Sequence, residues 1–280
     1  MCINTAVVNQ SLMIVFPNAK INIGLNITER RLDGYHNLET VFYPVKIFDV
    51  LEVIEADELS FESSGLDIPG RAEDNLCIKG YHLLKKDFPK LPPVKIHLHK
   101  NVPIGAGLGG GSANAAFFIK LMDEKFGLGL DEEEMMDYAR VLGADCAFFI
   151  SNRPVFAFEK GDEFEPVKLN LSAYHIVLVM PDAHVSTAEA YRGVKSTPVK
   201  ETVYDLVNMP VAAWKKHIRN DFEVHIFNNH PIIRGVKATL YERGALYASM
   251  SGSGASVFGI FETRPDLSDL EETCQVFYGV

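Results

Sequence analysis

The chain has 280 residues, of which 47% are hydrophobic and 23% charged, as is typical of a soluble globular protein with one large domain or two. The formal net charge is −10 and no run of Lys and Arg occurs, which disfavours a nucleic-acid-binding protein because phosphate backbones would be repelled. No apolar run approaches the roughly 20 residues that span a bilayer, and residues 1–16 lack the features of a signal peptide.

The four cysteines are widely separated and form no CxxC pair; they are Cys2, Cys77, Cys146 and Cys274. This spacing favours reduced, mostly buried thiols over a disulfide framework. We therefore expect a cytoplasmic protein with no membrane partner, whose ligands are small molecules. A monomer and a homodimer are both compatible with the sequence.

The first half of the chain mixes strand-like and helix-like segments. Alternating β-branched and aromatic residues predict strands, and apolar side chains three and four residues apart predict helices. The predicted strands are 13–27, 41–56, 58–64 and 93–100. The predicted helices are 73–88, with an apolar stripe of Leu76, Tyr81, Leu83 and Leu84, then 112–126 and 131–143.

After Pro154 the pattern changes. The sequence predicts a hairpin at 154–169, a buried strand at 174–181, helices at 186–194, 201–218 and 231–243, and a strand–turn–strand unit at 245–261. We place a domain boundary near residue 160, which gives domains 1–160 and 161–280. The fold class is α+β, with antiparallel sheets and helices in segregated groups.

The most informative stretch is NVPIGAGLGGGSANAA, residues 101–116. Its GxGxxG spacing fits a dinucleotide loop, but the following helix leads into another helix, which disfavours an NAD-dependent oxidoreductase. A P-loop would need a lysine before Ser112, and none is present. Five glycines before a helix have an entropic cost that a plain turn does not require, and their backbone N–H groups can hold an anion.

This loop resembles the second motif of the GHMP kinases, in which it wraps the phosphates of ATP. PNAKINIGLNI (17–27) is similar to the first motif of the family and SGSGASVFGIF (251–261) to the third. The resemblance is close over about 13–160, fair at 175–195 and 247–261, and weak at 195–245. It implies a two-lobed fold: an N-terminal mixed sheet with helices, a C-terminal antiparallel α/β sandwich lobe, and an active site in the cleft between them.

The resemblance also implies which residues contact the ATP phosphates. They are Pro103, Gly105, Gly107, Leu108, Gly109, Gly110, Gly111, Ser112 and Ala113, together with Gly252 and Gly254 of the third motif. Ala106 and Ala113 replace the usual Gly and Ser of the most similar members, and neither change removes a backbone donor. Ser112 would bind phosphate or Mg²⁺, with a helix N-cap as the compatible alternative. ATP and Mg²⁺ are the implied cofactors, the metal being held mostly by phosphate oxygens and water.

Asp145 in GADCAFFI matches the catalytic aspartate of the family, and Lys20 matches the lysine paired with it. A carboxylate near the acceptor hydroxyl can take its proton, and a nearby ammonium keeps that carboxylate ionised. The alternatives are a helix N-cap for Asp145 and a solvent-facing strand position for Lys20; the glycine loop favours the catalytic interpretation. Cys146 is interpreted as a small buried residue and not as a nucleophile.

The segments DGYHNL (33–38) and HVSTAEAYRGV (184–194) resemble those with which some GHMP kinases hold a cytidine. The resemblance implies that Tyr35, His36, Thr187 and Tyr191 contact the base by stacking and hydrogen bonding, although both tyrosines could be core or interface aromatics. Asn22 shares a strand face with Lys20, so we expect it to contact the substrate, with an Asn at the edge of the sheet as the alternative.

The implied reaction transfers the γ-phosphoryl group of ATP to the tertiary 2-hydroxyl of 4-diphosphocytidyl-2-C-methyl-D-erythritol, a step of non-mevalonate isoprenoid synthesis. A GHMP kinase for another alcohol and a non-catalytic nucleotide-binding protein of the same fold remain alternatives. His97 and His99 share a strand face, but no third metal ligand is close in sequence, so a half-exposed strand is the preferred interpretation. No role is assigned to Trp214.

Overall fold

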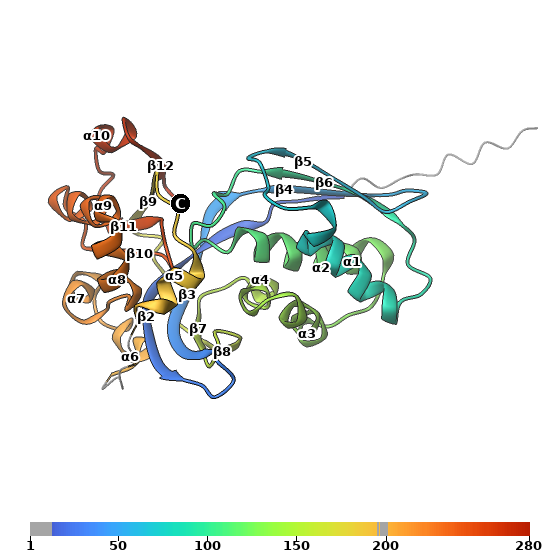
Figure 1. The fold of residues 1–280 in the computed structure, drawn as a ribbon, viewed down its shortest axis with the longest axis horizontal. Helices are drawn as coiled ribbons and strands as arrows, with labels where there is room; N and C mark the ends of the chain where they lie inside the picture. The colour runs from blue at the N-terminus through green and yellow to red at the C-terminus, as the bar shows by residue number, and fades with distance from the viewer. Residues whose placement is uncertain (1–12, 195, 197–200) are drawn as a thin grey trace, which may run out of the picture.

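Two long antiparallel strands, β2 (Asn18–Arg30) and β3 (His36–Phe48), run through the middle of the molecule and join its two lobes (Figure 1). The structure is a computed structural model, and it describes residues 13–194, 196 and 201–280. Every residue of β2 from Asn18 to Ile27 is buried, since both lobes pack against this strand. A polar side chain on this part of β2 therefore needs a partner, and it points toward the space between the lobes or into a sheet.

The N-terminal lobe is a mixed sheet covered on one face by helices (Figure 1). Its strands have the order β1-β4-β6-β5, in which β5 and β6 are parallel and the other pairs antiparallel. The strands are β1 (Met13–Val15), β4 (Val50–Glu55), β5 (Ser60–Gly65) and β6 (Val94–Lys100). The helices are η1 (Ala72–Asp74), α1 (Leu76–Asp87), α2 (Gly110–Phe126) and α3 (Glu132–Leu142). The mixed sheet predicted for this lobe is confirmed.

A second sheet extends from β2 and β3 toward the middle of the chain. Its order is β2-β3-β7-β8, where β7 (Val155–Phe158) and β8 (Glu163–Pro166) form the predicted hairpin. The short helices η2 (Ala144–Cys146) and α4 (Phe148–Ser151) precede it. Residue 160 lies in the turn of this hairpin, so a domain boundary placed after Pro166 would leave the sheet intact. The division into 1–160 and 161–280 stays a prediction.

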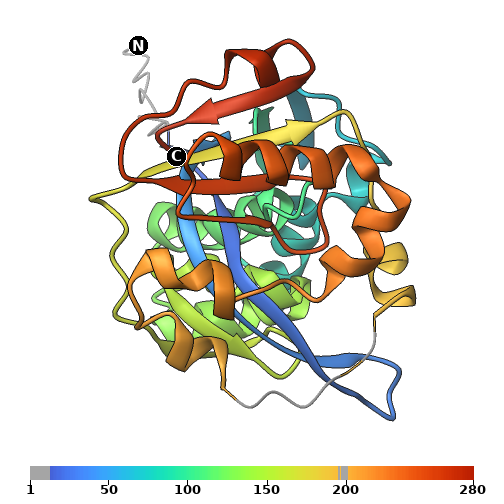
Figure 2. The same ribbon diagram turned by 90° about the vertical axis from the view of Figure 1, so that its left-hand side faces the viewer.

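The C-terminal lobe is an antiparallel sheet with helices on it (Figure 2). Its strand order is β10-β11-β9-β12. The strands are β9 (His175–Pro181), β10 (Tyr247–Met250), β11 (Val257–Phe261) and β12 (Cys274–Tyr278). The helices are α5 (Thr187–Arg192), α6 (Val203–Leu206), α7 (Val211–His217), α8 (Phe222–Asn229), α9 (Pro231–Glu242) and α10 (Ser268–Glu271). This arrangement is the antiparallel α/β lobe that the sequence predicted.

One apolar cluster is shared by both lobes. Ile21 and Ile23 of β2 pack in the same cluster as Trp214 of α7 and Phe258 of β11. Further along the same strand, Leu25 and Ile27 enter a separate cluster formed mostly by the C-terminal lobe. The two lobes are thus joined by a common hydrophobic core and not only by the chain that connects them.

Several predicted boundaries are wrong for identifiable reasons. The predicted strand 13–27 is interrupted at Phe16–Pro17, and 41–56 is interrupted at Asp49, where β3 ends. The single helix predicted at 201–218 is two helices, because Pro210 lacks an N–H and can only precede α7. The stripe of α1 is also shifted: Leu76 and Leu83 are half-buried, whereas the buried residues are Cys77, Ile78, Gly80, Tyr81 and Leu84. Within the part of the chain that the structure describes, no helix is long and apolar enough to cross a membrane.

Candidate active site

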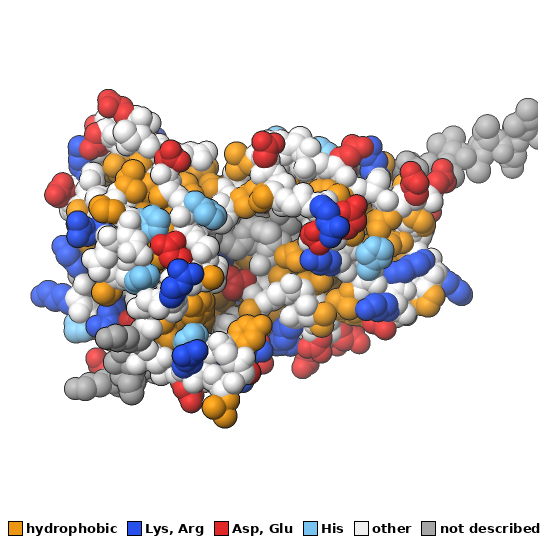
Figure 3. Space-filling view, in the orientation of Figure 1, with side chains coloured by type: hydrophobic (Ala, Val, Ile, Leu, Met, Phe, Trp, Pro, Cys, Tyr) orange, Lys and Arg blue, Asp and Glu red, His pale blue; other side chains and the backbone are white. Residues whose placement is uncertain are grey.

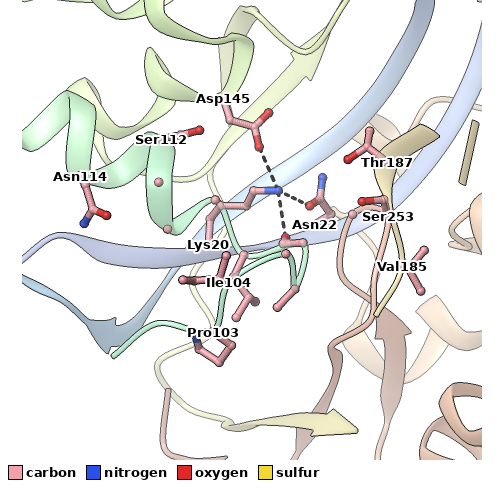
Figure 4. Close-up of a pocket in the computed structure, with 18 of the residues that line it drawn as sticks. Lys20, Asn22, Pro103, Ile104, Ser112, Asn114, Asp145, Val185, Thr187 and Ser253 are labelled. Carbon is pink, nitrogen blue, oxygen red and sulfur yellow. Dashed lines mark hydrogen bonds and ion pairs between the residues drawn. The ribbon is translucent and has the colours of Figure 1, made fainter. Parts of the chain in front are cut away.

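Lys20 and Asp145 meet at the floor of the space between the lobes (Figure 4). Lys20 projects from β2, and its Nζ lies 3.3 Å from Oδ2 of Asp145, which belongs to η2. The Lys20 side chain is 4% exposed and that of Asp145 36%, so the carboxylate is open to a ligand while the ammonium is enclosed. The helix N-cap alternative fails for Asp145, because Gly143 occupies the cap position of η2.

Three further groups hold the Lys20 ammonium in place. Nζ donates to Oδ1 of Asn22 at 2.5 Å and to the carbonyl of Gly107 at 3.2 Å, and it lies 4.8 Å from the centre of the Phe42 ring. The Asn22 amide nitrogen in turn donates to Oγ1 of Thr40 at 3.1 Å. Asn22 is buried and hydrogen-bonded on both sides of its amide, so it orients Lys20 as well as facing the cavity.

The glycine loop joins β6 to α2 and runs directly past this pair. Helix α2 begins at Gly110 after Gly109, whose φ of 69° is the left-handed conformation that glycine adopts without strain. The loop is clamped by the third motif of the C-terminal lobe: Ser251 Oγ donates to the Gly107 carbonyl at 2.9 Å, and Ser256 Oγ donates to the Ala106 carbonyl at 2.6 Å. The N-terminus of α2 therefore faces the cavity with unpaired N–H groups, which favours an anion there.

The main cavity between the lobes has a volume of about 480 Å³, and the face shown in Figure 3 is hollowed there. Most of the predicted site residues line it: Lys20, Asn22, Pro103, Gly105, Gly107, Leu108, Gly109, Gly110, Gly111, Ser112, Asp145, Thr187, Tyr191 and Gly252. Ala113 and Gly254 do not line it; Ala113 is fully buried in α2. Ser112 lies inside the first turn of α2 and is not its N-cap, which is Gly109.

A second cavity, of about 660 Å³, opens on the other side of Asp145. Tyr35 and His36 line it, and it shares Leu38, Asp145, Thr187 and Tyr191 with the main cavity. The rings of His36 and Tyr191 lie 5.0 Å apart at 30°, whereas Tyr35 is 65% exposed and its ring centre lies 6.0 Å from Lys160 Nζ. Arg140 and Lys160 also line this cavity, and the sequence analysis assigned neither of them to a ligand.

Burial sets the charge state of two groups around the second cavity. It lowers the pKa of His36 below its ordinary value, with the nearby Arg30 acting in the same direction, so the imidazole is neutral at pH 7. Burial, with a further contribution from Asp145, raises the pKa of Tyr191 to about 12, so its hydroxyl keeps its proton. Both rings can therefore stack on and hydrogen-bond to an uncharged base.

Several cavity residues were missed at the sequence level. The main cavity is also lined by Ile68, Asn75, Leu76, Lys100, Ile104, Asn114, Val185, Phe222 and Ser253. Ile68, Asn75, Leu76, Gly111 and Asn114 continue into an adjoining cavity of about 340 Å³. Five of the missed residues carried a signal by position: Ile104 and Asn114 lie in the quoted glycine stretch, Lys100 directly precedes it, Ser253 lies in the third motif and Val185 lies two residues before Thr187. The remaining residues are ordinary apolar or polar side chains that only the fold brings here.

The chemistry of the remaining candidates is also clear. Burial raises the pKa of the Cys146 thiol to about 12, partly offset by a hydrogen bond with Ser112, so Cys146 is not a thiolate nucleophile. His97 and His99 both lie within hydrogen-bond distance of Ser64 Oγ, at 3.1 and 3.0 Å. Among the residues with described positions, no group of three or more His, Cys, Asp or Glu side chains could hold a metal ion.

Two family models match the chain. The model of the GHMP kinase N-terminal domain matches residues 75–153, and the model of the GHMP kinase C-terminal domain matches residues 203–277, more than half of the chain together. The chain belongs to the GHMP kinase family. The fold and the glycine loop that the sequence resemblance implied are those of this family.

Curated relatives match this GHMP kinase over almost its whole length. The 4-diphosphocytidyl-2-C-methyl-D-erythritol kinase of Cytophaga hutchinsonii is 52% identical over 255 residues, which cover 91% of this chain and 94% of the relative. The protein of the same name from Bacteroides thetaiotaomicron is 51% identical over 269 residues, covering 95% and 98%. The one from Pelodictyon phaeoclathratiforme is 38% identical over 261 residues, covering 91% and 90%.

Solved structures agree with this assignment. A crystal structure of 4-(cytidine 5'-diphospho)-2C-methyl-D-erythritol kinase has a TM-score of 0.82 with this GHMP kinase at 28% identity, covering 95% of this chain and 98% of the other. A homoserine kinase from Cytophaga hutchinsonii has a TM-score of 0.68 at 17% identity, covering 97% and 95%. At that identity the second likeness shows the shared fold alone.

Proposed function

We propose that this GHMP kinase transfers the γ-phosphoryl group of ATP to the 2-hydroxyl of 4-diphosphocytidyl-2-C-methyl-D-erythritol, a step of non-mevalonate isoprenoid synthesis. The observation that carries the proposal is the position of Asp145, which lines both the cavity of the glycine loop and the cavity of Tyr35 and His36. A phosphoryl donor in the first cavity and an alcohol in the second would meet at its carboxylate. The curated relatives that share about half of the sequence carry the name of this activity.

ATP fits the main cavity and its neighbour. The phosphates would lie against the N–H groups of residues 103–113 and the first turn of α2, where the helix dipole favours negative charge. Gly252 and Ser253 of the third motif line the opposite wall. The nucleoside would extend into the adjoining cavity, where Asn75 and Asn114 offer hydrogen bonds and Leu76 and Ile68 offer apolar contact.

Mg²⁺ would arrive bound to ATP. The described residues form no cage of carboxylates and imidazoles for a resident ion, so the donor set fits a metal held by phosphate oxygens and water. Ser112, at the first turn of α2 and on the cavity wall, is the hydroxyl that would complete its coordination. When bound, the ion would offset charge on the transferred phosphoryl group.

The catalytic step needs positioning and one proton transfer. Asp145 would accept the proton of the 2-hydroxyl. At the same time the hydroxyl oxygen would bond to the γ-phosphorus of ATP, and the bond between that phosphorus and ADP would break. Lys20, held by Asn22 and the Gly107 carbonyl, would orient Asp145 and attract the developing charge on the γ-phosphoryl oxygens. Because Lys20 and Asp145 lie within 3.3 Å of each other in the cavity, a non-catalytic nucleotide-binding protein is the less favoured alternative.

The second cavity suits the cytidine diphosphate part of the acceptor. Tyr35, His36 and Tyr191 can stack on and hydrogen-bond to the base, and Thr187 lines both cavities, as Asp145 does. Arg140 and Lys160, which pair with Asp137 and Asp162, would offer two cations to the diphosphate. We further propose a cytoplasmic enzyme whose partners are small molecules, acting as a monomer or a homodimer.

A coupled ADP-release assay with MgATP and the cytidine-linked substrate tests the proposal. We expect turnover by the wild type and a fall in kcat of about 10²- to 10⁴-fold in Asp145→Asn, which keeps the shape but removes the base. Turnover that survives in the variant would remove Asp145 as the base. No turnover in the wild type with intact MgATP binding would favour another alcohol of the family, and the lack of competition by CDP would support that outcome.

A further inference from the structure

A buried carboxylate lies behind the glycine loop and takes no part in the proposed chemistry. Asp49, between β3 and β4, is 0% exposed and does not line the main cavity. Its Oδ1 accepts from the backbone N–H groups of Asn101 at 2.7 Å and Val102 at 2.8 Å. Its Oδ2 accepts from Lys100 Nζ at 2.5 Å and from the Asn114 amide at 2.8 Å.

These four donors all belong to the nucleotide-binding wall. Lys100 ends β6, Asn101 and Val102 begin the glycine loop, and Asn114 projects from α2, two residues after Ser112 (Figure 4). Lys100 and Asn114 both line the main cavity. A single carboxylate therefore joins the strand before the loop, the entry of the loop and the helix after it.

The Lys100 ammonium is placed directly beneath the first turn of α2. A Cβ on Gly110 would lie 2.8 Å from Lys100 Nζ, so the ammonium would have to shift if any other residue stood at this point. Lys100 is 4% exposed, and a buried ammonium needs a counter-charge to stay protonated. Asp49 is that counter-charge.

We propose that Asp49 is a positioning residue for ATP, which aims the charged Lys100 at the phosphate-binding turn and fixes the entry of the glycine loop. The proposal rests on the proposed function only in that ATP is the donor. It predicts that loss of the Asp49 charge weakens nucleotide binding while the acceptor cavity, on the other side of Asp145, is unaffected.

The titration of Lys100 gives this role a distinctive signature. Burial lowers the pKa of Lys100, and the Coulombic attraction and hydrogen bond of Asp49 act against that shift. The other titratable group facing it is Cys77 of α1, whose thiol is neutral because burial raises its pKa. Asn114 of α2 is uncharged. Without Asp49, the pKa of Lys100 falls further, and its charge is lost at a lower pH.

The test is the dissociation constant of MgATP, measured by isothermal titration calorimetry from pH 7 to pH 9.5 without any acceptor. We expect Asp49→Asn to raise it by about 10- to 100-fold, the range for lost hydrogen bonds to charged groups, and the increase to grow with pH. The affinity for cytidine should stay within about twofold, because Asp49 does not touch the second cavity. MgATP affinity in Asp49→Asn equal to that of the wild type over the whole pH range would overturn the proposal.

Two controls separate positioning from stability. Lys100→Met should weaken MgATP binding with no pH dependence, and Asp49→Asn/Lys100→Met should match it, since removing both charges leaves no unpaired ion. If Asp49→Asn does not fold, the double variant provides the test. MgATP binding weaker than that of Lys100→Met would show that Asp49 also fixes the loop entry. MgATP binding equal to that of the wild type would refute the role of Lys100. Glu223→Gln is the matched control: Glu223 is a buried carboxylate that accepts from Lys237, Ser249 and Met250, and its loss should lower stability without changing the pH profile of MgATP binding.

Discussion

At the scale of single residues, the carbonyl oxygen of Gly107 accepts hydrogen bonds from two parts of the chain that are far apart in sequence. It accepts from Lys20 Nζ of β2 and from Ser251 Oγ of the third motif. Gly107 has a φ of +75°, and a Cβ there would lie 2.0 Å from the Ser251 carbonyl oxygen, closer than any non-bonded contact allows. The hydrogen bond of Lys20 and the loop clamp therefore both depend on the absence of a side chain at Gly107.

The contrast with Gly111 gives the first prediction. Gly107→Ala should lower the melting temperature and abolish MgATP binding, because the loop must move away from Ser251. A Cβ on Gly111 would meet nothing within 4 Å, so Gly111→Ala should raise stability, by about 0.5 kcal/mol or more for a helical glycine. Its methyl would nevertheless occupy space in the phosphate cavity and weaken MgATP binding. Calorimetry and thermal melts check both; tighter MgATP binding by Gly111→Ala would place the phosphates elsewhere.

A second prediction concerns the protonation of His36. Its pKa is lowered by burial and by Arg30, so the neutral imidazole present at pH 7 should bind the cytosine. Because the folded value lies below the ordinary value of about 6.5, affinity for cytidine should hold at neutral pH and fall only as the pH drops through the lowered pKa. Titration calorimetry between pH 8 and pH 5.5 measures this. His36→Gln should bind more weakly and show no such pH dependence; an unchanged profile in that variant would assign the titration to another group.

At the scale of elements, sequence patterns predicted the long, strongly periodic segments well. The helices at 112–126 and 131–143, the strand at 93–100 and the hairpin at 154–169 are confirmed with small shifts of their ends. In contrast, α8 was missed because its apolar residues Phe222, Val224 and Ile226 alternate with polar ones, which is not helical spacing. Strand β12 was missed because its residues are mostly half-exposed at a sheet edge. Trp214, to which no role was assigned, proves to be a core residue.

The candidate site divides in the same way. Lys20, Asp145 and the glycine loop carry motifs within short stretches, so the sequence located them. Arg140, Lys160 and Asn75 reach the cavities only through the arrangement of separate elements. Arg140 in particular was interpreted from the sequence as a basic residue in the last turn of a helix. It does lie in the last turn of α3, but its place in the cavity could not be seen from that position.

Helix α5 supports a prediction at this scale. It carries Thr187 and Tyr191, and Glu189 on the same helix accepts from His230 Nε2 at 2.8 Å. The hydrogen bond to His230 lowers the pKa of Glu189. The carboxylate therefore stays ionised and bonded to the end of α8 at every pH above the ordinary glutamate pKa of about 4.3, and the bond is lost only as the pH falls through the lowered pKa. Glu189→Ala should weaken cytidine binding by about three- to tenfold, the range for one lost hydrogen bond, and leave MgATP binding unchanged.

The matched control for this prediction is Asp269→Asn. Asp269 pairs with Arg243 at 2.7 Å, a similar ion pair on another part of the C-terminal lobe that touches neither cavity. That variant should bind cytidine and MgATP as the wild type does. Equal losses in the two variants would mean that α5 needs no fixed position.

At the scale of the whole molecule, the shared core predicts one cooperative unfolding unit. Trp214 is the only tryptophan of the chain and is fully buried in the C-terminal lobe, so its fluorescence reports on that lobe. MgATP at about 100 times its dissociation constant should add about 2.7 kcal/mol to the free energy of unfolding. We expect the Trp214 transition and the circular dichroism transition to coincide and to shift together. A Trp214 transition that MgATP leaves in place would show that the lobes unfold separately.

The packing of strand β2 also limits which parts of such a chain can be exchanged between related proteins. Ile21 and Ile23 pack with Trp214 and Phe258, residues about 200 positions later, while Leu25 and Ile27 fill a cluster formed mostly by the C-terminal lobe. A crossover between two related genes near residue 160 would join strand β2 of one protein to the C-terminal lobe of the other. The packing residues of the two parts would then come from different proteins and need not fit together. We therefore expect chimaeras that exchange β2 together with residues 167–280 to fold where simple halves do not.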